Sequence, residues 1–334
     1  MTGPAAASEP TELRVLASGE WRARAEAHAR RADAFSAGWR SRRPKQLPHA
    51  IDDFLFTYYP TKPGKLRRWH PGAGVALAGA DERAAWRDYR AVGMQDARGR
   101  AVGDRAVTVD ATAVLGREHV QAGWIEGLIR RTRDREARFG CFGLHEWAMV
   151  YRQRPDEVRH ELPLRLGHDG TDAVVEANDI ACTHFDAYRF FTPAAEPRNR
   201  FRPTRAEQPE LEQSGCLHAN MDLYRWAMRF GPIVPGELLL DAFELARDVR
   251  ELDMRASPYD VSEYGLEPVA IETREGKREY AAAQRTFATR GDELRVRLLA
   301  AIERARAFAG DASPGTRAIP PRRGVVVTPA SAPR

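Results

Sequence analysis

Apolar side chains recur along most of this chain at the spacing of an α-helix. Between His49 and Tyr59, the apolar residues Ile51, Phe54 and Tyr58 fall at positions i, i+3 and i+7, the buried face of an amphipathic helix. The run from Trp21 to Trp39 is rich in alanine and arginine, both strong helix formers. Further segments with helical patterns are residues 111–138, 142–151, 217–230, 235–252 and 276–308. The pattern therefore predicts a mainly helical chain.

Residues 73–110 have a different pattern, in which short segments of partial alternation are separated by turn residues. The strings GVALAG, WRDYRAV and RAVTVD approach the two-residue period of half-buried strands and predict a small antiparallel sheet. LPLRLG and AVVEANDIACTHF, within residues 162–185, are expected to form further short strands. The predicted fold class is mainly α, of the α+β kind: a helical globular domain with a small antiparallel sheet.

Composition predicts where the globular part begins and ends. Residues 1–10 and 307–334 are rich in alanine, proline, glycine and serine and lack an apolar period, so we expect a disordered N-terminus and a flexible basic tail. Residues 11–306 are long enough to bury the core of a single globular domain, with residues 73–110 as a small β-rich part.

Charge, hydropathy and cysteine content restrict the partners and the cellular compartment that we expect for the protein. Of the formal net charge of +5, +3 lies in the tail from Ala307 onward, so the basic pI says little about nucleic acid. No stretch has the roughly 20 apolar residues that span a bilayer, and the first residues lack the order of a signal peptide. Three cysteines are too few, and odd in number, for a disulfide framework. We expect a cytoplasmic protein with reduced thiols and no membrane partner.

Each cysteine is followed closely by a histidine. Cys141 and His145 lie four residues apart and would share one face of a helix. Cys182, His184 and Asp186 would alternate onto one side of a strand. Within each of these two segments, the cysteine and the histidine are therefore predicted to point to the same side.

The third segment of this kind has the sequence CLHANMD and lies at the expected start of a helix. His218 follows Cys216 by two residues, and Asn220 or Asp222 would cap the first amides of that helix. We expect the three segments to form one shared site.

The imidazoles and carboxylates of these segments permit two kinds of catalytic site. A divalent transition metal would be bound by the histidines and an aspartate, whereas no Cys-x-x-Cys pair indicates a zinc ribbon. In a metal-free site, a partly buried carboxyl beside an imidazole would activate water. In a third alternative, the cysteines and histidines only pack in the core. The predicted metal ligands are His145, His184, Asp186 and His218. The predicted catalytic residues are Glu146, Asp186, Asp222, His145, His184 and His218.

Aromatic residues occur beside arginines in several segments of the chain, and they are the second candidate for a functional site. Rings and guanidinium groups of this kind suit a pocket for a flipped base, and they also suit an ordinary core edged by arginines. The proline-rich segment 189–205 carries five arginines and one glutamate, and would bind a phosphate or carboxylate unless it is a solvated loop. The predicted substrate-binding residues are Tyr58, Trp147, Tyr188, Arg189, Arg202, Arg205, Asn220 and Trp226.

Several nucleotide and hydrolase motifs are absent from the sequence. No Gly-x-Gly-x-x-Gly follows a strand, and there is no Walker-type Gly-Lys-Ser/Thr. No Gly-x-Ser-x-Gly elbow occurs either. We expect no nucleotide cofactor and no serine-hydrolase chemistry.

Five long strings carry a family resemblance: FGCFGLHEWAMVYR, CTHFDAYRFFTP, PRNRFRPTR, GCLHANMDLYRWA and ELDMRASPYD. They resemble a family of actinobacterial proteins labelled 3-methyladenine DNA glycosylase, over about Val15 to about Arg304. The resemblance implies hydrolysis of the N-glycosidic bond of an alkylated purine in damaged DNA, with a flipped base between aromatic rings. A glycosylase hairpin is approached only by IVPGELLLDAF, which lacks the second glycine, with Asp248 or Asp253 downstream. No catalytic residue is transferred from the established glycosylase folds.

Three functions follow as hypotheses. The first is an alkylpurine DNA glycosylase in which a carboxylate orients water and the histidines assist. The second is a metal-dependent oxygenase or hydrolase, of the non-haem iron kind or similar, acting on a small anionic metabolite. The third is a non-catalytic binding protein whose Cys/His segments are structural. The metal content of the protein distinguishes the second from the others.

Overall fold

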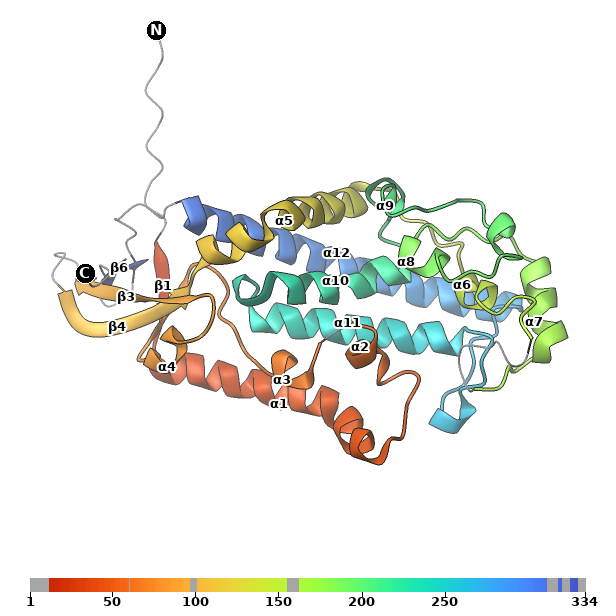
Figure 1. Ribbon diagram of the computed structural model, residues 1–334, viewed down its shortest axis with the longest axis horizontal. Coiled ribbons are helices and arrows are strands. Elements are labelled where there is room, and N and C mark those ends of the chain that lie inside the picture. Colours follow the sequence, from red (N-terminus) through yellow and green to blue (C-terminus); the bar gives the residue numbers. More distant parts are fainter. Residues whose placement is uncertain are drawn as a thin grey trace, which may run out of the picture.

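Long helices lie side by side along the long axis of the molecule (Figure 1), with a small sheet at one end and short helices and loops at the other. This computed structural model describes residues 12–59, 61–96, 101–154, 162–310, 318–319 and 325–329. The mainly helical architecture with a small sheet confirms the predicted fold class. The long helices are α1 (Ser18–Arg42), α5 (Ala111–Asp134), α10 (Leu217–Phe230), α11 (Gly236–Arg255) and α12 (Arg274–Gly310).

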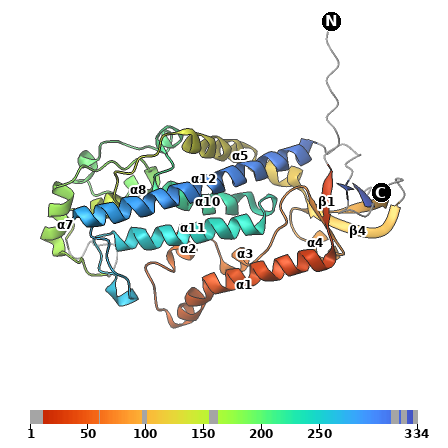
Figure 2. The same ribbon diagram turned by 180° about the vertical axis from the view of Figure 1, so that it is seen from behind.

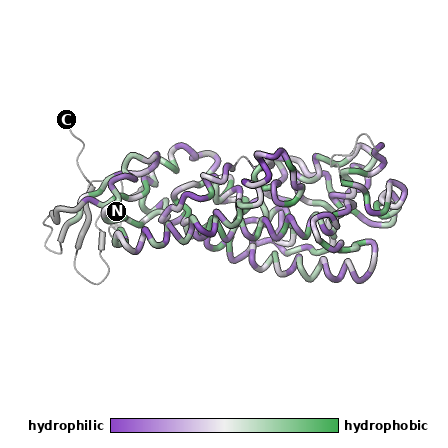
Figure 3. Tube along the Cα trace, turned by 90° about the horizontal axis from the view of Figure 1, so that it is seen from below, coloured by the Kyte–Doolittle hydropathy of each residue, from purple (hydrophilic) through white to green (hydrophobic). Residues whose placement is uncertain are grey.

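The core of the bundle lies where α10, α11 and α12 pack against one another, with α5 against α12 and α10. Seen from behind, α12 runs along α10 and α11 (Figure 2). Apolar and polar residues alternate along these helices (Figure 3), as amphipathic packing requires. Phe230, Phe243 and Ile302 are fully buried at this interface, and such side chains each stabilise the fold by about 1.5–3 kcal/mol.

Several predicted helices are confirmed with small shifts of their ends. The segment 217–230 is α10, and the run from Trp21 to Trp39 lies within α1. The predicted helix from His49 to Tyr59 contracts to α2 (Phe54–Thr57), and residues 50–53 before it form a turn. The short helices are α2 (Phe54–Thr57), α3 (Pro63–Leu66), α4 (Asp81–Ala84), α6 (Leu144–Ala148), α7 (Gly167–Glu176), α8 (Phe185–Tyr188) and α9 (Gln208–Leu211). The 3₁₀ turns are η1 (Arg43–Lys45), η3 (Glu196–Arg198), η4 (Gly231–Ile233) and η5 (Ser262–Tyr264).

The sheet has the strand order β5-β1-β2-β4-β3-β6 and is mixed. The predicted antiparallel arrangement holds for β2, β4 and β3, which come from residues 73–110. Strand β1, which the sequence pattern does not predict, pairs in parallel with β2, and helix α1 provides the long crossover that parallel strands need. The strands are β1 (Leu13–Leu16), β2 (Val75–Ala78), β3 (Tyr89–Asp96), β4 (Ala101–Val109), β5 (Ala318–Ile319) and β6 (Val325–Pro329).

The strands predicted within residues 162–185 are wrong. The string AVVE lies in helix α7, where Thr171, Val174 and Val175 fall on one buried face at helical spacing. Only single bridges form nearby, between Leu164 and Tyr259 and between Ile180 and Asn199, because no neighbouring strand continues the pairing.

Composition predicted that the globular domain spans residues 11–306, and the structure can be compared with this prediction at both ends. Residues 1–10 lie outside the described part. Helix α12 continues to Gly310, and the tail contributes the short strands β5 and β6, paired with β1 and β3. No helix in the described part of the chain is long and apolar enough to cross a membrane.

A close contact between α12 and α10 depends on Gly291. A Cβ atom at this position would collide with the side-chain oxygen of Asn220. That oxygen accepts a hydrogen bond from Arg295 at 2.9 Å, while the amide of Asn220 donates to the backbone oxygen of Ser214 at 2.9 Å. Asn220 therefore joins helix α12 to the segment before α10. The predicted caps are wrong, since no side chain caps this helix at Cys216.

We expect Gly291→Ala to destabilise the protein by about 1–3 kcal/mol, because the added methyl group forces α12 away from Asn220. Gly123→Ala in the middle of α5 is the matched control. Its Cβ meets nothing within 4 Å, so alanine should stabilise the helix by about 0.5–1 kcal/mol. Chemical unfolding of both variants measures the difference. Equal effects would show that the α10–α12 contact is loose.

Candidate metal centre

The structure brings His145, His184 and His218 together from three separate elements. Their ring centroids lie 4.6 Å apart for His145 and His218, and 5.2 Å apart for His184 and His218. All three side chains line one cavity of about 570 Å³, together with Cys141, Cys182 and Cys216. Segments that are far apart in the sequence therefore line the same cavity.

Each histidine reaches this cavity by a different route. His145 is on the short helix α6, which begins after Gly143 in the left-handed conformation (φ 71°). His184 is extended, directly before α8. His218 is in the first turn of α10, one helical turn before Asp222.

The first group of candidate metal ligands combines two histidines and one carboxylate. Nε2 of His145 lies 3.0 Å from Oδ1 of Asp253, in the last turn of α11. The ligand atoms of His145, His218 and Asp253 all lie within 4.8 Å of one another. We call this group the first triad.

The second group combines one histidine and two carboxylates. Nε2 of His184 lies 3.1 Å from Oε1 of Glu212 and 3.5 Å from Oδ2 of Asp222. The ligand atoms of His184, Glu212 and Asp222 also lie within 4.8 Å of one another, and all three residues are buried. We call this group the second triad. It adjoins the first, since the rings of His184 and His218 are stacked.

The inner atoms of both triads lie at ion-pair distance from one another, but their directions do not fit well-aligned hydrogen bonds. Nε2 of His145, Nε2 of His184, Oδ2 of Asp222 and Oδ1 of Asp253 are buried without an aligned partner in the described structure. Buried polar atoms nearly always have such a partner. Lone pairs that converge without hydrogen bonds are expected of metal ligands, and imidazole with carboxylate is a ligand set for divalent transition metals.

The histidine pKa values show how the triads distribute their charge. Burial lowers the pKa of His184, but Glu212 and Asp222 outweigh it and raise this pKa to about 10. For His145, burial is likewise outweighed by Asp253, so its pKa is raised. Burial and the neighbouring His145 lower the pKa of His218 to about 3. A proton on His184 thus balances part of the carboxylate charge, Asp253 favours a proton on His145, and a metal ion would replace such protons.

Groups outside the triads hold the carboxylates in place. The hydroxyl of Tyr59 donates to Oδ1 of Asp222 at 2.9 Å, and the amide of Gln208 donates to Oε1 of Glu212. The guanidinium of Arg250 donates to Oδ2 of Asp253 at 3.4 Å. Such outer contacts fix the orientation of metal ligands.

Glu146 lies beside the first triad. Its Oε1 is 4.0 Å from Nε2 of His145 and 3.3 Å from Nη1 of Arg250. Burial and the nearby carboxylate of Asp253 raise the pKa of Glu146. A carboxyl of this kind can exchange a proton with a group bound in the site.

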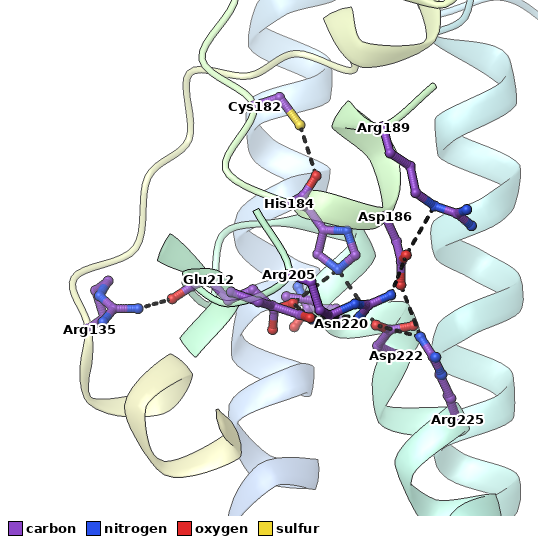
Figure 4. A network of polar contacts seen from close by, with 12 residues as sticks. Arg135, Cys182, His184, Asp186, Arg189, Arg205, Glu212, Asn220, Asp222 and Arg225 are labelled. Carbon is purple, nitrogen blue, oxygen red and sulfur yellow. Dashed lines mark hydrogen bonds and ion pairs between the residues drawn. The ribbon is translucent and has the colours of Figure 1, made fainter. Parts of the chain in front are cut away.

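Asp186 is not part of either triad, although the sequence predicted it as a metal ligand. Helix α8 begins between His184 and Asp186 and replaces the expected strand alternation. The carboxylate instead pairs with Arg189 at 3.1 Å, Arg205 at 2.8 Å and Arg225 at 3.1 Å (Figure 4). Asp186 is therefore placed to anchor arginines.

The aromatic residues predicted to hold a base lie in different places. Trp147 is fully buried and donates its indole hydrogen to the backbone oxygen of Ala256. Tyr58 lines a cavity of about 270 Å³ with Glu146 and His218, whereas Trp226 lines another cavity of about 680 Å³. The described cavities do not bring these rings into one pocket.

The other predicted substrate-binding residues are distributed as widely. Tyr188 packs against Phe191 at a ring-centroid distance of 5.1 Å, and Arg202 is exposed. Arg189 donates to the hydroxyl of Tyr58 at 3.4 Å. Asn220 has only the packing role described above.

Two residues of the triads, Asp253 and Glu212, are not among the metal ligands that the sequence predicts. The sequence pattern does indicate that Asp253 is buried, because it follows Ala246 and Val249 at helical spacing on the buried face of α11. A carboxylate on such a face needs a charged or metal partner. Glu212 gives no comparable signal, since it comes after the end of the short helix α9.

The three cysteines are free thiols on the cavity wall. Burial raises the pKa of the Cys182 thiol to about 12, and it also raises the pKa values of Cys141 and Cys216. Sγ of Cys182 contacts the backbone oxygen of His184 at 3.7 Å. The cysteines are thus neutral near physiological pH and stand outside both triads.

Comparisons with family models, curated proteins and solved structures found no match for this chain. The resemblance to the glycosylase-labelled family therefore stays a prediction.

We expect the protein to bind one transition-metal ion at each triad when it is loaded with ferrous iron or manganese. His145→Ala and His184→Ala should each lose about one ion, because each removes an imidazole from a different triad. His168→Ala, in α7 and outside both triads, is the matched control and should retain both ions. Elemental analysis after gel filtration measures the ratio. Metal-free wild-type protein would contradict this assignment.

Tyr59→Phe should weaken metal binding at the second triad by about 10-fold, because Asp222 loses the hydrogen bond that orients it. Tyr264→Phe, whose hydroxyl accepts from the backbone amide of Ala50, is the control. Competition with a metal-binding dye measures both affinities. Unchanged affinity in Tyr59→Phe would show that the metal does not depend on Asp222.

Proposed function

We propose that this chain is a metal-dependent enzyme that binds two metal ions and acts on a small organic anion. The observation that carries the proposal is the pair of buried triads, whose inner atoms converge without hydrogen bonds. Buried polar atoms that lack an aligned hydrogen bond are costly unless a ligand satisfies them. Two adjoining sites of histidine and carboxylate oxygen supply that ligand set for a pair of ions.

The size and lining of the adjoining cavity support a small anionic substrate. Its volume of about 570 Å³ suits a small molecule. Arg138 and Arg200 are among its lining residues, and the Arg138 guanidinium lies over the ring of Phe201 at 5.3 Å. Among the described residues, Arg138 has no carboxylate within ion-pair distance, so it is available to a substrate carboxylate or phosphate.

The ligands favour oxygen-dependent chemistry. The first triad is a set of two histidines and one carboxylate, the set that non-haem iron oxygenases use with open positions for oxygen and substrate. Di-iron and di-manganese sites are also built between facing helices of a bundle. Here α10 and α11 contribute His218 and Asp253 from adjacent helices.

Hydrolysis is the second candidate, and Glu146 favours it. Metal ions lower the pKa of bound water, and a neighbouring carboxylate can accept its proton. Glu146 lies within 4.0 Å of a predicted ligand, and its raised pKa suits proton transfer closer to neutral pH.

The glycosylase hypothesis rests on the family resemblance and predicts a metal-free reaction. It remains testable with the same protein. Release of 3-methyladenine from alkylated DNA by protein from which the metal has been removed would favour it over the metal-dependent proposal.

We expect the ferrous-loaded protein to oxidise its iron on mixing with aerated buffer faster than free ferrous iron does. His218→Ala should slow this reaction, because the first triad loses a ligand, and His168→Ala should leave it unchanged. Stopped-flow absorbance measures the rates. If wild type reacts no faster than His218→Ala, the oxygen-dependent proposal is wrong.

In that event, activity of zinc-loaded protein on nitrophenyl esters and phosphates tests hydrolysis. Glu146→Gln should then lower the rate by about 100-fold. Absence of both activities and of bound metal would contradict the proposed function as a whole.

A further inference from the structure

A second large cavity lies farther along helix α10, beyond the second triad. It has a volume of about 680 Å³, within the range of small-molecule sites. The side chains that line it come from helix α5, from the C-terminal half of α10, from α3 with the segment before it, and from the loop that precedes α9. The cavity is thus built between packed elements of the bundle.

One part of the lining is aromatic. The rings of Trp124 on α5 and Trp226 on α10 meet edge to face, with centroids 5.9 Å apart. Trp226 is almost completely buried, whereas Trp124 is 37% exposed. A large, partly exposed ring in a concave site offers a stacking face to a flat ligand.

The charged part of the lining is entirely basic. Lys65, Arg205, Arg225 and Arg229 line the cavity, and no carboxylate does. Arg205 and Arg225 are each held by Asp186, and Arg229 is held by Glu118 at 2.7 Å. These three arginines are therefore pre-positioned, and their side chains stay between 37% and 48% exposed.

Lys65 is less constrained than the arginines. It is exposed on α3 and, in the described part of the chain, has no carboxylate within ion-pair distance. Among the cations of the cavity, it is the one whose charge has no acidic neighbour. Basic groups that surround apolar walls concentrate anions from solution.

We propose that this cavity is a binding site for an aromatic organic anion, with its ring against Trp124 and Trp226 and its acidic group at Lys65 and Arg229. The site lies back to back with the second triad, because Tyr59 lines the cavity and donates its hydroxyl to Asp222. Its recognition groups are not metal ligands. The site is therefore separate from the proposed metal centre, and its test does not depend on that function.

Isothermal titration calorimetry with three naphthalene probes tests the proposal on the full chain. The probes are naphthalene carboxylate, naphthyl phosphate and the neutral naphthalene carboxamide. We expect at least one anion to bind about ten-fold more tightly than the carboxamide, because the neutral group cannot form charge-assisted hydrogen bonds. Which anion binds more tightly distinguishes a carboxylate from a phosphate ligand.

Variants assign the binding to this cavity. Trp124→Ala should weaken all bound probes by about five-fold or more, because stacking is lost. Lys65→Gln should weaken only the anions. The matched controls are Leu166→Ala, at another exposed apolar side chain, and Lys45→Gln, at another exposed lysine. Both controls should bind like wild type.

Metal-free and metal-loaded protein are titrated in parallel. Similar affinities are expected, since the cavity uses no metal ligand. Binding only in the metal-loaded form would place the anion at the metal centre and overturn the proposal. Absence of binding, equal affinity for the carboxamide, or no effect of Trp124→Ala and Lys65→Gln would also overturn it.

Discussion

The interior of the helical bundle must hold several charged groups where there is little water to solvate them. Three imidazoles and the carboxylates around them come together between α6, α10 and α11. An uncompensated buried charge is costly, so each carboxylate requires a proton, an arginine or a metal ion nearby. Arg250, which is only 2% exposed, supplies part of that charge to Glu146 and Asp253. The packing around the bundle depends on this balance being kept.

Helix α10 organises both cavities through its own periodicity. His218, Asp222, Arg225 and Trp226 follow one another at positions i, i+4, i+7 and i+8, so they lie along one side of the helix. His218 faces the first cavity, Asp222 belongs to the second triad, and the last two residues line the second cavity. One helix face thus connects the metal centre to the proposed anion site.

Asp186 connects the arginine-rich segment 189–205 to this face of helix α10. Its buried carboxylate accepts hydrogen bonds from Arg205 in the loop and from Arg225 on α10. Because the Asp186 side chain is only 6% exposed, its carboxylate needs these cationic partners, although the arginines themselves are partly exposed. The aspartate therefore has a positioning role, and the arginines that it holds remain partly exposed to the second cavity.

The sequence alone determined the helical class, the segments that form α1 and α10, and the strands within residues 73–110, because these depend on local periodicity. It also singled out His145, His184 and His218. Their convergence was decided by the tertiary structure, since contacts between residues 34 and 73 positions apart depend on how the helices pack.

The same limit explains the ligands that were misassigned. The sequence predicts Asp186 as a ligand because it lies two residues after His184, where strand alternation would keep both side chains on one side. The start of α8 turns Asp186 toward the arginines instead. Glu212, directly after α9, and Asp253, on α11, reach the histidines through tertiary packing.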